Sequence, residues 1–189
     1  MRVIAGEYKG RSLQAVPGKN TRPTTDKVKE SIFNLLEQHS FTGGLALDLY
    51  AGTGGLGIEA LSRGLDKVIF VDTHKKAINI INQNLDSLSI SNQAEVYRNE
   101  ASRALKAIIK RELSFDLIFL DPPYAEQQIS TQLAVINDYN LLAEEGRVVV
   151  ETGKDTDLPK QVGQLQQWKH QNYGETDIRI YVQRSKEDM

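Results

Sequence analysis

The sequence predicts an α/β protein built on a mostly parallel, Rossmann-like sheet. Apolar strand-like runs alternate with helical patterns from residue 45 to residue 120, and such alternation is typical of parallel sheets. The apolar run at residues 46–51 ends in a cluster of four glycines and then becomes helical. Two consecutive alternating runs near the C-terminus predict that an antiparallel hairpin closes the sheet.

The N-terminal region is expected to form a β-hairpin followed by a helix. Residues 1–16 alternate in polarity around Gly6-Glu7-Tyr8-Lys9-Gly10, a composition that suits a hairpin better than a helix. Apolar residues then recur at i, i+4, i+7 and i+8 from Val28, the spacing of one helix face, and Thr24 or Thr25 is the expected N-cap.

Seven strands are expected in the sheet, with helices between the parallel ones. The predicted strands are Leu45–Tyr50, Lys67–Val71, Glu95–Arg98, Phe115–Leu120, Gly146–Glu151, 168–172 and 178–182, and the predicted helices cover 56–63, 77–88 and 105–109. We interpret the chain as a basic hairpin arm, residues 1–23, attached to one Rossmann-like domain, residues 24–189.

Composition limits the class of protein. A chain of 189 residues that is 40% hydrophobic can bury one α/β core but is too short for two full domains. It has no apolar run near the roughly 20 residues that span a bilayer and no signal peptide at its start, so we expect a cytoplasmic protein without membrane contact. With no cysteine and three scattered histidines, we expect no metal, and we expect a monomer.

The charge is unevenly distributed along the chain. The net charge is −2, but residues 1–30 hold seven Lys and Arg against three acids, which leaves −6 on the remainder. A basic arm of this kind can bind phosphates. We expect Lys9, Arg11, Arg22 and Thr24 to contact nucleic-acid phosphates, from a hairpin that projects from the sheet edge near Asp121. An ordinary solvated terminus is the alternative interpretation.

The glycine cluster predicts a cofactor site. Gly52-x-Gly54-x-x-Gly57, with Asp72 twenty residues beyond Gly52, fits a dinucleotide-binding loop. Asp48, four residues before Gly52, would repel a pyrophosphate but would suit a cationic cofactor. S-adenosylmethionine carries a sulfonium and an amino group, so we expect Asp48 to face its methionine end and Asp72 to bind its ribose.

A second motif, Asp121-Pro122-Pro123-Tyr124, follows the fourth parallel strand, at the edge where α/β folds bind ligands. Asp121 and the Pro122 carbonyl could accept both N–H bonds of an exocyclic amino group, which leaves its lone pair for attack on a methyl group. The Tyr124 ring could stack on the base. A simple turn after a buried strand is the alternative interpretation.

Together these motifs resemble a known enzyme family. The Asp-Pro-Pro-Tyr motif resembles that of amino methyltransferases. Four N-terminal stretches and Tyr173-Gly174-x-Thr176 in the last hairpin are similar to the RsmD family, and these stretches are Arg2–Gly6, Lys9–Arg11, Thr21–Thr24 and Lys29–Leu36.

The resemblance implies a class I methyltransferase that uses S-adenosylmethionine to methylate guanine N2 in small-subunit (16S) rRNA, within a ribosomal particle. Glu100 stands where the family usually has Asp or Asn to meet the adenine amino group, and the Ala101 N–H could serve the adenine ring. The expected mechanism is direct transfer to a flipped-out base. Three alternatives remain: an amino methyltransferase acting on DNA or tRNA, an NAD-dependent oxidoreductase, and a non-catalytic RNA-binding module.

Overall fold

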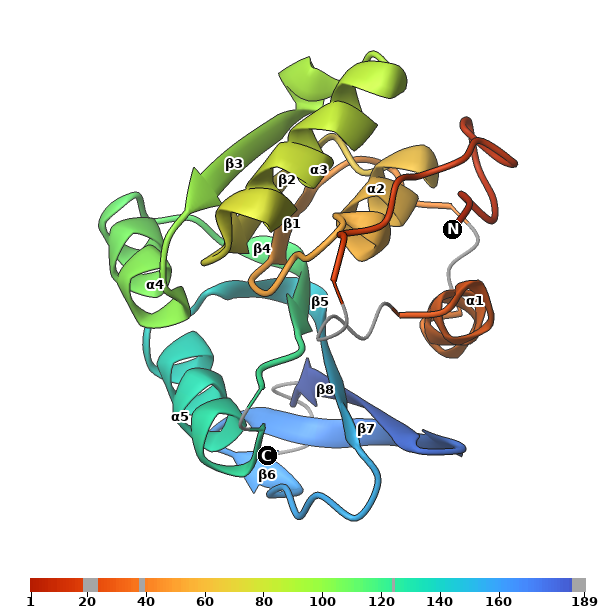
Figure 1. Cartoon of the computed structure of the whole chain (residues 1–189). Helices are drawn as coiled ribbons and strands as arrows, with labels where there is room; N and C mark the ends of the chain where they lie inside the picture. Colours follow the sequence, from red (N-terminus) through yellow and green to blue (C-terminus); the bar gives the residue numbers. More distant parts are fainter. Residues whose placement is uncertain (19–23, 38–39, 124, 185–189) are drawn as a thin grey trace. The chain divides into compact units, whose positions relative to one another are not determined.

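The computed structural model describes residues 1–18, 24–37, 40–123 and 125–184, and the chain divides into two compact units, Met1–Ala107 and Ile108–Met189 (Figure 1). The boundary falls within helix α4. The elements of the first unit are α1 (Asp26–Leu35), β1 (Leu45–Asp48), α2 (Gly55–Ser62), β2 (Lys67–Asp72), α3 (Lys75–Ser87), the 3₁₀ turn η1 (Ser91–Gln93), β3 (Ala94–Arg98) and most of α4 (Ala101–Lys110).

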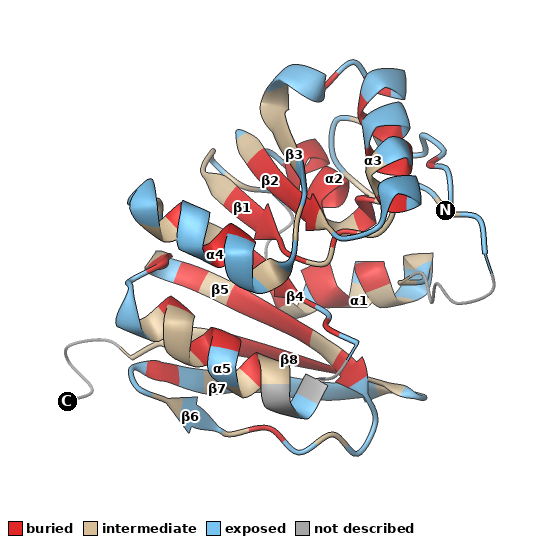
Figure 2. Ribbon diagram, turned by 60° about the vertical axis from the view of Figure 1, so that its left-hand side comes forward, coloured by how far each residue is buried: buried red, intermediate tan, exposed pale blue. Residues whose placement is uncertain are grey.

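The first unit contains three parallel strands in the order β3-β2-β1. Helix α2 packs on β1 and β2, and α3 packs on β2 and β3. Figure 2 shows β1 and β2 largely buried, whereas α3 is buried on one side and exposed on the other, as its apolar spacing predicts. Helix α1 begins after Thr25, whose hydroxyl oxygen accepts the Val28 N–H at 3.2 Å, so the expected N-cap is confirmed.

The second unit holds five strands in the order β4-β5-β8-β7-β6. Its elements are β4 (Phe115–Leu120), α5 (Ala125–Asp138), β5 (Leu142–Gly153), β6 (Gln161–Val162), β7 (Leu165–Tyr173) and β8 (Thr176–Gln183). Strands β4 and β5 are parallel, and β5, β8, β7 and β6 pair antiparallel, so the predicted closing hairpin is confirmed. Two elements of this unit were not expected from the sequence: α5, and the two-residue β6, which makes eight strands in the described residues instead of seven.

The N-terminal segment, defined here as residues 1–14, forms a minimal hairpin. A bridge joins Arg2 to Ser12, and the Val3 and Leu13 amides donate to the carbonyls of Arg11 and Met1, each at 2.9 Å, but no regular strand forms.

The expectation that this hairpin projects is wrong. Its backbone bonds to α2 through Ser62, whose carbonyl accepts the Glu7 N–H and whose hydroxyl accepts the Tyr8 N–H and donates to the Ala5 carbonyl. Val3 and Leu13 are buried. The physical reason is that these two apolar side chains leave water only if the segment lies on the body of the unit.

Candidate cofactor site and target-base turn

Asp48 is the last residue of β1, and its side chain is buried. Its Oδ2 accepts the N–H of Gly57 at 3.2 Å. Gly57 lies in the first turn of α2, where amides have no partner within the helix, so the carboxylate satisfies one of them and lies at the positive end of the helix dipole. Asp48 therefore has a structural role in addition to the cofactor role expected from the sequence.

The glycines of the loop differ in what they do. Gly52 and Gly54 have φ of 57° and 81°, values that favour glycine, and a Cβ on Gly52 would meet nothing within 4 Å. Gly57 is required by packing instead, because a Cβ there would come within 2.4 Å of the Phe70 ring. The open side of Gly52 is thus the place where a ligand can approach the backbone.

Asp72, the last residue of β2, holds the glycine loop directly. Its Oδ2 accepts the Gly52 N–H at 2.9 Å, and its Oδ1 accepts the His74 N–H at 2.9 Å. The Asp72 carbonyl accepts the Asn99 N–H at 3.1 Å, which ties the end of β3 to the end of β2. Asp72 therefore links the glycine loop to the carboxyl ends of β2 and β3. In α/β sheets, ligands bind at this edge, outside the carboxyl ends of the strands.

Glu100 and Ala101 lie at the start of α4. The Glu100 carbonyl accepts the Ala104 N–H at 2.9 Å, and the Glu100 amide donates to Asn99 Oδ1. The Glu100 carboxylate is 66% exposed and lies 4.0 Å from Arg103 Nε. Its side chain is directed to solvent and to its own helix.

The Asp121-Pro122-Pro123 turn belongs to the second unit. It follows β4 directly, and the pairing of Leu120 with Val150 sets it beside the second half of β5. Asp121 and Pro123 are exposed, whereas Pro122 is buried. Tyr124, the expected stacking residue, lies outside the described residues.

The residues expected to bind RNA have different surroundings. Lys9 is exposed. Arg11 is exposed too, but its Nη2 donates to the Ser87 carbonyl at 2.8 Å, at the C-terminal end of α3, where a cation is favourable. Thr24 is half-buried just before the N-cap of α1, and Arg22 lies outside the described residues.

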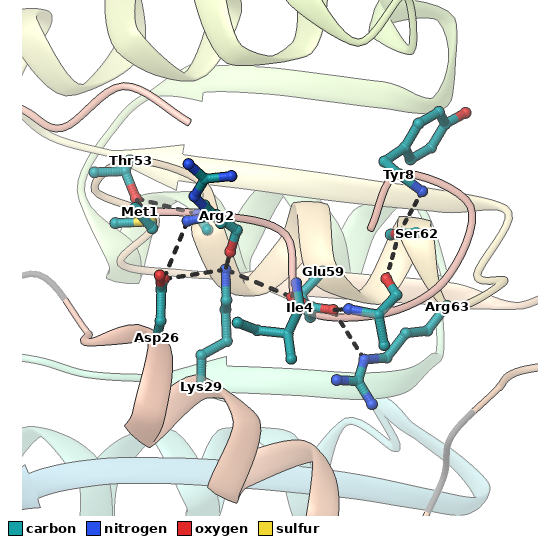
Figure 3. Close-up of polar contacts among 12 residues, drawn as sticks. Met1, Arg2, Ile4, Tyr8, Asp26, Lys29, Thr53, Glu59, Ser62 and Arg63 are labelled. Atoms are coloured by element: carbon teal, nitrogen blue, oxygen red, sulfur yellow. Dashed lines mark hydrogen bonds and ion pairs between the residues drawn. The ribbon is translucent and has the colours of Figure 1, made fainter. Parts of the chain in front are cut away.

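Sequence reasoning missed a buried ionic cluster that binds the N-terminal segment to α1 and α2 (Figure 3). Glu59 is fully buried, and its carboxylate accepts the Ile4 N–H at 2.8 Å, the Ala5 N–H at 3.1 Å and the Arg63 Nε–H at 2.9 Å. Lys29 Nζ lies 3.5 Å from Glu59 Oε1.

Lys29 in this cluster also bonds to the backbone, and its pKa is shifted by its surroundings. Its Nζ donates to the Arg2 carbonyl. Burial lowers the pKa of the Lys29 ammonium, and the negative charges of Glu59 and Asp26 partly offset this. A lysine and a glutamate within otherwise buried helical faces were the sequence signals for the cluster.

Asn84 was also missed. It lies on α3 within the apolar stripe and is 1% exposed, and its amide bonds to both Gln14 and Thr53. The signal was a polar residue between Ile81 and Leu88 at a position of helical spacing that otherwise faces the core.

The fold and the loop define a Rossmann-like α/β protein with a glycine loop at the carboxyl end of its first strand. Residues 1–182 match the model of the family described as "Conserved hypothetical protein 95". The chain belongs to this family, and the resemblance to the RsmD methyltransferases found in the sequence is confirmed.

Similar proteins come from several bacteria. The chain is 53% identical to "Putative rRNA methyltransferase YlbH" of Bacillus subtilis over 97% of this chain and 100% of that protein. It is 35% identical to "Ribosomal RNA small subunit methyltransferase D" of Haemophilus influenzae over 84% of this chain and 81% of that protein. A solved structure, "Putative methyltransferase yhhF" from Escherichia coli, superposes with a TM-score of 0.82 at 27% identity and covers 97% of each chain.

The described residues contain neither a membrane-spanning helix nor a cluster of metal-binding side chains. None of their helices combines the length and apolarity needed to cross a membrane. No group of three or more His, Cys, Asp or Glu side chains is placed to hold a metal ion in this part of the chain.

Proposed function

We propose that this protein transfers a methyl group from S-adenosylmethionine to the exocyclic N2 of a guanine in small-subunit rRNA. The observation that carries the proposal is the bond from the Gly52 amide to Asp72 Oδ2, which fixes a glycine loop with an open face beside a carboxylate at a strand end. The names of the relatives support the substrate class, and the motif at Asp121 supports the choice of an amino group as acceptor.

In this proposal the first unit binds the cofactor, which supplies an electrophilic methyl group on sulfur. Asp48 faces its cationic methionine end, and Asp72 accepts hydrogen bonds from the ribose hydroxyls. Asp72 Oδ1 is engaged by the His74 amide and lies 3.3 Å from the His74 Nδ1 atom, whereas Oδ2 accepts the Gly52 N–H and has a second lone pair that can accept a hydroxyl. Gly52 and Gly54 let the backbone approach the ligand, and the Ala101 N–H serves the adenine ring.

The turn after β4 binds the base. Asp121 and the Pro122 carbonyl accept the two N–H bonds of the guanine amino group, and the Tyr124 ring stacks on the flipped base. With its two N–H bonds held in this way, the N2 lone pair would be directed at the methyl group that S-adenosylmethionine would supply, and Asp121 or water would take the surplus proton on N2. Orientation and exclusion of water contribute most of the rate enhancement, on a scale of up to about 7–11 kcal/mol.

The RNA lies against the basic N-terminal region. In this proposal the side chains of Lys9, Arg11 and Arg22 contact phosphates, which gives no base specificity. Thr24, just before the N-cap of α1, also contacts the RNA. We further propose that the enzyme is a cytoplasmic monomer that needs no metal and acts on rRNA within a ribosomal particle.

The experiment that tests the proposal uses labelled S-adenosylmethionine. The protein is incubated separately with naked 16S rRNA, assembled small subunits, tRNA and duplex DNA, and the labelled nucleoside is identified after digestion. We expect N2-methylguanosine in the rRNA arms. Label in N6-methyladenine of DNA, or in tRNA alone, would refute the rRNA assignment, and no label in any arm would favour a non-catalytic module.

A further inference from the structure

Asn84 connects two parts of the first unit that the proposed function treats separately. These are the N-terminal segment and the cofactor loop, which we define as residues 51–55. Asn84 Oδ1 accepts the Gln14 N–H at 2.7 Å, and its Nδ2 donates to the Gln14 carbonyl at 3.1 Å and to the Thr53 carbonyl at 2.9 Å. Both amide hydrogens and one carbonyl lone pair are thus used.

The bond to Thr53 fixes a peptide plane in the middle of the cofactor loop. A peptide unit is planar, so holding the Thr53 carbonyl also sets the direction of the Gly54 N–H. That N–H donates to the Ala51 carbonyl at 2.8 Å and closes the turn. Asn84 therefore acts on the backbone at the glycines that are expected to approach the ligand.

The N-terminal segment also contacts the loop directly (Figure 3). Met1 Sδ lies 3.6 Å from Thr53 Oγ1, and a Cβ on Gly55 would lie 2.9 Å from the same sulfur. Thr53 Oγ1 in turn accepts the Gly55 N–H at 3.2 Å. The carbonyl and the hydroxyl of Thr53 are thus contacted from different sides, the carbonyl by α3 and the hydroxyl by the N-terminal segment.

The segment is itself firmly placed. Glu59 binds the Ile4 and Ala5 amides near its start, and Asn84 binds both backbone groups of Gln14 at its end. The inner side of the segment is therefore a fixed support, whereas its outer side carries the exposed Lys9.

We propose that Asn84 is a positioning residue for the cofactor, which holds the cofactor loop in its binding conformation through the Thr53 carbonyl and braces it against the N-terminal segment. The inference rests on the proposed use of this loop for S-adenosylmethionine. Its physical basis is that a glycine-rich loop loses more conformational freedom on binding than other backbone, and a loop already fixed loses less.

The test uses Asn84→Asp, which has nearly the same shape and keeps the acceptor for the Gln14 N–H but turns a carboxylate oxygen toward two carbonyl oxygens. Asn82→Asp is the matched control, since Asn82 is exposed on the same helix and undergoes the same change of charge. Calorimetric titration with S-adenosylmethionine, chemical denaturation, and kcat and KM at saturating RNA are measured for both.

We expect Asn84→Asp to raise the cofactor dissociation constant and KM about tenfold, with kcat within twofold of the unsubstituted protein, because Asn84 does not touch the reacting atoms. Asn82→Asp should stay within twofold throughout. If Asn84→Asp lowers stability but leaves cofactor affinity unchanged, or lowers kcat without changing KM, the proposal is overturned.

If the aspartate variant fails to fold, Asn84→Ser takes its place, because serine keeps a small polar group at this position. An unchanged cofactor affinity of Asn84→Ser would overturn the proposal, and a several-fold weaker affinity would support it. Failure of the unsubstituted protein to bind S-adenosylmethionine would instead refute the proposed function, so the two failures are distinguishable.

Discussion

At the scale of single residues, the two carboxylates that we propose for cofactor binding also accept hydrogen bonds from backbone amides. Asp48 bonds to the Gly57 N–H, and Asp72 bonds to the amides of Gly52 and His74. A buried amide left without a partner costs about 1–3 kcal/mol. Substitutions at these positions therefore need a stability measurement beside every binding measurement.

Asp72→Ala should weaken binding of S-adenosylmethionine by about 1.5–3 kcal/mol, the scale of hydrogen bonds to a charged group. It should also lower the free energy of unfolding, because two amides lose their acceptor. Titration calorimetry and chemical denaturation measure the two effects. Asp138→Ala, an exposed acid on α5, is the control. An unchanged dissociation constant for Asp72→Ala would refute the ribose assignment.

Asp121→Ala should reduce methyl transfer by about 100-fold or more, the scale of losing one oriented hydrogen bond in a transition state. Asp121 is exposed, so the fold should remain intact and cofactor affinity should stay within several-fold. Single-turnover transfer and calorimetry check this, with the exposed Asp157→Ala as control. Loss of cofactor binding equal to the loss of rate would argue against a role at the amino group.

At the scale of elements, the N-terminal segment has two sides with different chemistry. Its inner side contributes buried apolar residues and backbone bonds to the Glu59 cluster, to Ser62 and to Asn84. Its outer side presents cations. The segment is therefore both part of the fold and a candidate RNA contact, and the two roles can be separated by substituting the outer side alone.

The double change Lys9→Ala and Arg11→Ala should weaken RNA binding. It should also make the slope of the logarithm of the binding constant against the logarithm of salt concentration shallower by roughly the amount of two phosphate contacts, because each such contact releases counterions. Stability should fall by only about 0.3–1 kcal/mol, from the Arg11 bond at the end of α3. Cofactor affinity should not change.

A salt titration of RNA binding together with thermal unfolding measures these effects. The exposed pair Lys106→Ala and Lys110→Ala on α4 provides a control with the same change of charge. If the salt dependence of RNA binding is unaltered and stability falls strongly, the outer side of the segment stabilises the fold and does not contact RNA.

At the scale of the whole molecule, a buried tyrosine of the second unit makes the free energy of unfolding depend on pH in the alkaline range. Tyr181 on β8 is fully buried, and its hydroxyl donates to the Pro159 carbonyl at 2.7 Å. Burial raises its pKa from 10.0 to about 12, although the nearby Arg179 charge acts in the opposite direction.

Between pH 10 and pH 12 the unfolded chain therefore releases this proton and the folded protein keeps it. The free energy of unfolding should fall across this window by about 2–3 kcal/mol in total, whereas below pH 10 the contribution is constant. Tyr181→Phe should remove this part of the pH dependence, and denaturation curves from pH 8 to pH 12 measure it. Parallel decreases in the two proteins would contradict the assignment.

Most of the fold could be predicted from the sequence because it depends on local patterns. Helical spacing and alternating polarity located the parallel strands, the helices between them and the closing hairpin, and Phe115–Leu120 matches β4 at both ends. Helix α5 was not predicted, and β6 is a two-residue strand, too short to leave a pattern. The predicted hairpin exists, but the direction in which it packs depends on long-range burial that local patterns do not contain.

The candidate site, too, could be predicted from the sequence only where it depends on local patterns. The sequence by itself determined the glycine loop, the carboxylates at the ends of β1 and β2, and the Asp-Pro-Pro-Tyr motif, because each of these is a short run of residues whose chemistry is local. Only the tertiary structure decided that Asp72 bonds to Gly52, that Glu59 holds the N-terminal segment, and that Asn84 joins Gln14 to Thr53. These partners lie 20, 55, 70 and 31 residues apart in the chain, and pairing across such separations is set by how the helices and strands pack.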